Sequence, residues 1–132
     1  MENVTYGITR ELPDIPYEEA VVKVTEAIAT EGFGVLTEID VKATLKKKLD
    51  VDFRKYVILG ACNPKLAHRA LSAEPHIGLL LPCNVIVMER DGGGSVVSAI
   101  HPEVQFTLVE RPGLGKIACE VKEKLERALD TL

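Results

Sequence analysis

Apolar and polar positions follow a helical period in two long segments of the chain. Residues 16–31 place one apolar stripe along a helix, with Pro16 in the first turn and Gly32 after the last one. Residues 115–131 place a second stripe at the same spacing. Because each stripe needs an apolar partner, both segments are predicted to be amphipathic helices that pack on the same face of a sheet.

Shorter segments carry the patterns of strands. Residues 56–62, YVILGAC, are apolar throughout, which predicts a central strand buried on both faces. Residues 83–100 run from one apolar segment through a Gly-rich turn into another, which is typical of a β-hairpin. Further strands are predicted at residues 3–11, 33–40 and 103–109.

Two side chains are placed to begin short helices between these strands. Asp40 precedes a segment that carries Val41, Leu45 and Leu49, and Asn63 is followed by Pro64, a favourable first helical residue. The resulting element order predicts an α+β fold, with helices on one face of a mostly antiparallel sheet and a single domain over residues 1–132.

Composition and charge narrow the classes of partner. The 132 residues carry a net charge of −4, so nothing indicates binding to nucleic acid or to an anionic membrane surface. No segment has the apolar length of a membrane span, and the first residues lack the pattern of a signal peptide. Three cysteines, an odd number, argue against a disulfide framework. We therefore expect a cytoplasmic protein with reduced thiols.

Cys62 is the first residue that could carry chemistry, since it ends a predicted strand immediately before a helix. The unpaired N–H groups and the dipole of a helix N-terminus favour a thiolate over a thiol. The competing interpretation is packing, because free cysteine is among the most buried residue types.

A second Cys-Asn pair, Cys83-Asn84, begins the hairpin. If the strands that hold Cys62 and Cys83 lie close together in the sheet, their Cα atoms are expected within about 10 Å. Asn63 and Asn84 have structural interpretations, as a helix cap and as a turn residue beside Pro82, yet their amides could also bind a ligand. The spacing of the cysteines carries no metal signature, so neither a metal nor a cofactor is assigned.

His68 lies one helical turn after Cys62 and is the nearest candidate for a general base. It lies beside the apolar stripe of its helix, and we interpret it as facing solvent.

The segments YVILGACNPKLAHRAL and GLLLPCNVIV resemble a bacterial and archaeal family known as domain of unknown function 302, from about residue 4 onward. The resemblance implies a β-α-β(4)-α arrangement similar to the TATA-binding-protein-like fold, with extra short helices, and homodimeric members. It implies no activity. Its pattern includes Cys62, Asn63, Pro64, His68, Leu81, Pro82, Cys83 and Asn84. This chain departs from it at His101, where relatives tend to have an acidic residue before the next proline.

Three functions remain open. The first is a homodimeric domain that binds a small ligand or metal near Cys62, Asn63, Cys83 and Asn84. The second is a thiol enzyme in which Cys62 is the nucleophile and His68 its base. The third is a structural or assembly module in which both Cys-Asn segments only pack and cap.

Overall fold

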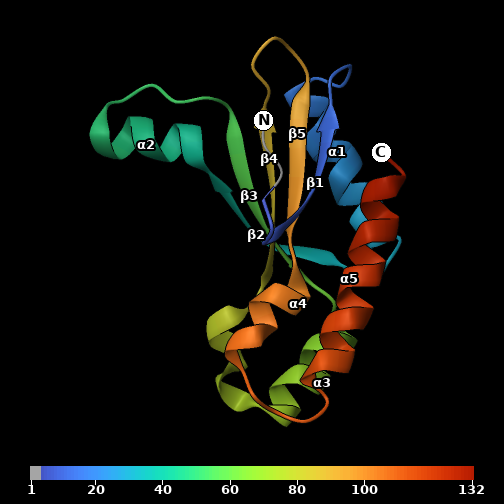
Figure 1. Ribbon diagram of the computed structural model, residues 1–132. Helices are drawn as coiled ribbons and strands as arrows, with labels where there is room; N and C mark the ends of the chain where they lie inside the picture. The colour runs from blue at the N-terminus through green and yellow to red at the C-terminus, as the bar shows by residue number, and fades with distance from the viewer. Residues whose placement is uncertain (1–3) are drawn as a thin grey trace.

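The computed structural model describes residues 4–132, which form a five-stranded antiparallel sheet with its main helices on one face (Figure 1). The strands are β1 (Gly7–Leu12), β2 (Gly34–Asp40), β3 (Tyr56–Cys62), β4 (Cys83–Glu89) and β5 (Ser95–Ile100), in the spatial order β1-β5-β4-β3-β2. The α-helices are α1 (Tyr17–Ala29), α2 (Val41–Leu49), α3 (Pro64–Ala73), α4 (Pro102–Gln105) and α5 (Leu114–Asp130), and two 3₁₀ helices are η1 (Pro75–Leu80) and η2 (Phe106–Leu108).

This order confirms the predicted α+β fold, because α1 and α5 are the two long helices of a β-α-β(4)-α arrangement and the remaining helices are short insertions. The strand predicted from residue 3 begins at Gly7 in the structure, and residue 3 itself lies outside the described residues. No helix within residues 4–132 is long and apolar enough to cross a membrane.

Helices α1 and α5 pack side by side on one face of the sheet, as their stripes predicted. Val24 and Ile28 of α1 and Leu125 of α5 are fully buried, and they belong to one core with the inward side chains of β3, β4 and β5. At the hairpin turn between β4 and β5, Gly94 lies so close to the backbone of Pro13 that a Cβ there would collide with it. Burial of these stripes stabilises the fold by roughly 1.5–3 kcal/mol for each large side chain.

The opposite face of the sheet is open. β3 is an inner strand between β4 and β2, as predicted, but the prediction that both of its faces are buried is wrong. Val57 and Leu59 of β3 are buried under the helices, whereas Tyr56 and Ile58, which point to the other face, are only partly buried. Helix α2 projects away from the sheet on this open side (Figure 1). The apolar residues on one face of β3 are therefore part of the core, whereas those on its other face stay partly exposed.

Helix α2 begins where the sequence predicts, because the Asp40 side chain accepts a hydrogen bond from the Ala43 N–H at 2.9 Å. None of its residues is buried, so its apolar positions do not join the core. Leu49, at its last turn, is 66% exposed.

The strand predicted at residues 103–109 is wrong, since this segment forms α4 and η2. Pro102 supplies the first helical residue, where its fixed φ is favourable and its missing N–H costs nothing. The helical path instead buries Phe106, which the alternating pattern had placed in a sheet.

Candidate functional site: an apolar cavity with two thiols

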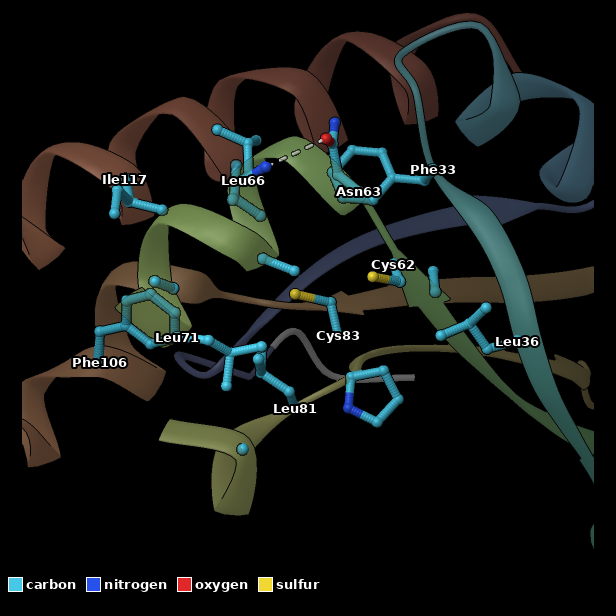
Figure 2. A pocket seen from close by; sticks show the side chains of 16 residues that line it. Phe33, Leu36, Cys62, Asn63, Leu66, Leu71, Leu81, Cys83, Phe106 and Ile117 are labelled. Carbon is cyan, nitrogen blue, oxygen red and sulfur yellow. Dashed lines mark hydrogen bonds between the residues drawn. The ribbon is translucent and has the colours of Figure 1, made fainter. Parts of the chain in front are cut away.

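A cavity of about 300 Å³ lies where β3 ends and β4 begins, beneath α3 and α5 (Figure 2). Its walls come from segments that are distant in the sequence. They are formed by Phe33, Leu36, Ala61, Cys62, Asn63, Leu66, Ala67, Ala70, Leu71, Gly78, Leu81, Pro82, Cys83, Phe106, Ile117 and Val121. The lining is almost wholly apolar, and the two thiols and one amide are its polar groups.

The two cysteines reach this cavity from adjacent strands. Cys83 is the residue after Pro82 and lies opposite Ala61 in the antiparallel pairing, so it is offset from Cys62 by one residue. From the spacing of strands and the rise per residue, their Cα atoms are about 6 Å apart, within the predicted 10 Å. Figure 2 shows both thiols directed into the cavity, toward α3.

The two thiols differ in their surroundings. Cys62 is partly exposed, whereas only 7% of Cys83 is exposed. Burial raises the pKa of the Cys83 thiol to about 11, and the neighbouring Cys62 adds to the shift. Cys83 is therefore a neutral thiol at neutral pH, and the more accessible Cys62 is the one that meets a reagent first.

Asn63 lines the cavity but its amide is already used within the fold. The side-chain oxygen accepts from the Leu66 N–H at 3.4 Å, which caps α3 as predicted, and the side-chain nitrogen donates to the Glu31 carbonyl at 3.2 Å. Gly32 makes this second bond possible, because it has φ +89° and a Cβ there would lie 3.0 Å from the Asn63 nitrogen. Asn63 thus joins β3, α3 and the end of α1 into one wall.

Asn84 does not reach the cavity. It lies within β4, where side chains alternate between faces, so it points to the open side of the sheet while Cys83 points inward. There it borders a separate, shallower hollow beside Tyr6 and Ile86. The predicted role of Asn84 as a turn residue is wrong for the same reason.

His68 is also outside the cavity. It is exposed on α3, as the solvent-facing interpretation predicts, and it is not among the residues that line the cavity around Cys62. Of the five predicted site residues, the structure therefore brings together Cys62, Asn63 and Cys83 and separates Asn84 and His68 from them.

Several cavity residues were predicted only as core or not at all. Ile117 was part of the C-terminal helical segment, Val121 belonged to its stripe, and Phe106 was assigned to a strand. Leu81 and Pro82 had a signal, since they precede Cys83 in the family pattern. Gly60 also marks the position, because a Cβ on it would collide with Thr37 and with Pro82.

The chemistry available in the cavity is narrow. Within residues 4–132, no group of three or more His, Cys, Asp or Glu side chains converges as a metal site would require. Charged side chains of the surrounding helices lie at the surface, where Arg69 of α3 pairs with Glu120 of α5 at 2.9 Å. The cavity offers apolar contact surface and two thiols.

Comparisons with known proteins agree with this architecture. The family model described as "Domain of unknown function DUF302" matches residues 8–132. A crystal structure of an uncharacterized conserved protein DUF302 from Bacillus stearothermophilus is similar, with a TM-score of 0.87 and 29% sequence identity, over 96% of this chain and 98% of the other. No curated protein matches the chain.

Proposed function

Given that this chain belongs to the family described as domain of unknown function DUF302, we propose a function from its own cavity: it binds a small apolar molecule against Cys62 and Cys83. The observation that carries the proposal is the cavity of about 300 Å³ with apolar walls. Small-molecule sites are commonly concave, of at least this volume and lined mainly by apolar side chains.

The position of the cavity supports binding rather than simple looseness of the core. It lies between the rigid ends of two hydrogen-bonded strands and a helix that Asn63 caps, so its walls are held from several sides. Leu36 and Leu71, which are 68% and 40% exposed, stand where the cavity meets solvent and provide an apolar entrance.

A series of linear alcohols from butanol to decanol tests this proposal by calorimetric titration. Each added methylene is expected to increase affinity about fourfold, from roughly 0.8 kcal/mol per buried CH₂, until the chain fills the cavity and the increase stops. A series with no measurable binding would contradict the proposal.

A matched pair of variants on α3 locates the binding. Ala67 lines the cavity, whereas Ala73 is exposed outside it. Ala67→Leu is expected to fill the cavity and weaken alcohol binding by at least about tenfold, since a leucine occupies the space of the ligand, while Ala73→Leu leaves binding unchanged. Equal effects of the two substitutions would show that the alcohols bind elsewhere.

The thiol enzyme with Cys62 as nucleophile and His68 as base is the weaker alternative. Its support is reduced because His68 is exposed on α3 and is not part of the cavity lining. A structural or assembly module remains the other alternative, and it predicts that no alcohol binds at all.

We further propose that the protein is a symmetric homodimer, as the family resemblance implied. The open face of the sheet supports this, because within residues 4–132 several of its apolar side chains stay at least partly exposed and do not pack beneath α1 and α5. They include Tyr6, Ile39, Tyr56, Ile58, Ile86, Met88 and Ile100. Cyclic dimers are the commonest oligomers, and uncovered apolar faces commonly mark interfaces.

Light scattering tests the dimer with two substitutions of similar exposed residues. Ile39 on β2 is 48% exposed and lies in register with Ile58 on the open face, and Val22 on α1 is 55% exposed elsewhere. Ile39→Lys is expected to give the monomer mass at micromolar concentration, because it would bury a charge in the interface, whereas Val22→Lys keeps the dimer mass. A monomer mass for the unmodified protein would contradict the dimer.

Three broader predictions stay proposals. One continuous core supports a single domain, and the β-α-β(4)-α order supports a likeness to the TATA-binding-protein fold. Such a likeness carries no DNA binding, since fold does not imply function and the net charge is −4. The three free cysteines support a reducing compartment such as the cytoplasm.

A further inference from the structure

We propose that Cys62 and Cys83 are a redox pair, which an alkyl hydroperoxide entering the cavity oxidises to a disulfide. The inference rests on the proposed function, because the same apolar cavity admits the alkyl group of the oxidant. It adds the chemical class of a molecule that reacts there.

The backbone geometry suits the bond. The two residues are one position out of register on adjacent antiparallel strands, which places their Cα atoms about 6 Å apart, within the range that disulfides span. Both thiols line the same cavity and point into it (Figure 2).

The two thiols are suited to successive steps. Cys62 is partly exposed, so an oxidant that enters the cavity reaches it first. Cys83 is buried and stays a neutral thiol, and it lies beside Cys62, the thiol that reacts first. An accessible cysteine beside a second one is the usual arrangement of redox-sensitive thiols.

The reaction balances in two steps. The Cys62 thiolate attacks the outer oxygen of the hydroperoxide, the O–O bond breaks, and the alkoxide leaves as the alcohol after taking a proton, which gives Cys62 sulfenic acid. The Cys83 sulfur then attacks the Cys62 sulfur, and its proton leaves with the displaced hydroxyl as water. The thiols lose two electrons and the hydroperoxide gains them.

The hydroperoxide class follows from the cavity walls. Phe33, Leu81 and Phe106 surround the thiols with hydrocarbon, so an alkyl group gains contact there that hydrogen peroxide cannot make. The exposed Cys119 on α5 has no such surroundings and provides an internal reference.

The experiment uses the full chain with Cys119→Ser, treated with tert-butyl hydroperoxide or hydrogen peroxide and followed by intact mass. We expect both remaining thiols to be lost together, with the loss of two hydrogen atoms and full recovery after dithiothreitol. In Cys83→Ser/Cys119→Ser, Cys62 is expected to gain oxygen atoms instead. Independent oxygen addition at both cysteines of Cys119→Ser, or no reaction, would overturn the pair.

Selectivity is measured as the ratio of the rates with tert-butyl hydroperoxide and hydrogen peroxide. The ratio for Cys62 is expected to exceed the ratio for Cys119 in Cys62→Ser/Cys83→Ser by at least about tenfold, the gain from burying two methyl groups. Equal ratios overturn the alkyl class. Oxidation by hydrogen peroxide tests the thiol pair without requiring that the cavity bind an alkyl group. The alcohol titrations test binding in the cavity without requiring thiol chemistry. Failure of the redox pair can therefore be distinguished from failure of the proposed binding function.

Discussion

The dipeptide Cys-Asn occurs twice beside the cavity, and the two copies are used in different ways. Cys62-Asn63 lies where the chain leaves β3 for α3, and both side chains line the cavity. Cys83-Asn84 lies inside β4, and its two side chains point to opposite faces of the sheet. The same two residue types therefore give one shared wall in the first case and a division between two surfaces in the second.

The difference comes from the backbone rather than from the side chains. Successive residues of a strand alternate by geometry, so Asn84 must leave the face that Cys83 occupies. At the end of β3 the chain turns, and Asn63 adopts the extended conformation of a helix cap, which returns its side chain to the side of Cys62. In this fold the Cys-Asn pair forms a joint wall only where the strand ends.

The largest expected effect concerns Cys83 at high pH. Its pKa is about 11 in the fold against 9.0 as the reference, so the unfolded chain loses its proton first as the pH rises. The contribution of Cys83 to the free energy of unfolding is therefore fully present below about pH 9. The free energy of unfolding is expected to fall by roughly 2–3 kcal/mol as the pH approaches 11. Denaturant unfolding across this pH range measures it.

The control is Cys83→Ala, since tyrosines and lysines also titrate in this range. The difference in free energy between the two proteins isolates the contribution of Cys83. A fall of equal size in both proteins would place the cause elsewhere.

The next effect concerns Asn63. Asn63→Ala removes the cap of α3 and the bond to the Glu31 carbonyl, and is expected to lower the free energy of unfolding by about 1–2 kcal/mol. Asn63→Asp keeps the capping oxygen and loses only the donor, so its loss should be smaller. Chemical denaturation of the three proteins distinguishes them. An unchanged free energy of unfolding for Asn63→Ala would show that the two hydrogen bonds of the Asn63 side chain make no net contribution to stability.

The smallest effect is expected at Asn84. Asn84→Ala should change the free energy of unfolding by less than about 0.5 kcal/mol, since the side chain is exposed and does not line the cavity. Octanol affinity should also stay unchanged in titration calorimetry. A loss of octanol binding would join Asn84 to the site and remove the contrast between the two dipeptides.

Sequence reasoning succeeds where the cause is local. The Asn63 cap, the proline that follows it and the glycine turn between β4 and β5 each depend on residues within a few positions, and all were predicted correctly. It fails at Phe106, because alternation over a few residues fits a strand as well as a short helix that Pro102 begins.

The site itself was only partly readable for a related reason. An apolar strand face looks the same in sequence whether a helix covers it or not, so β3 gave no indication that Ile58 would lie on an open surface. The hydrocarbon wall formed by Phe33, Phe106 and Val121 depends on packing between distant segments, which no spacing within one segment encodes.

The pairing of β1 with β5 has a consequence for the order in which the protein can be made. Ile8 pairs with Ala99, so β1 must wait for a partner that follows it by about 90 residues. Because β5 follows β2, β3 and β4 in the chain, the backbone donors and acceptors of β1 have no strand partner until residues 95–100 have been synthesised. The edge strand β1 therefore precedes the other four strands in the chain, yet it can pair only after β5, the last of them, has been made.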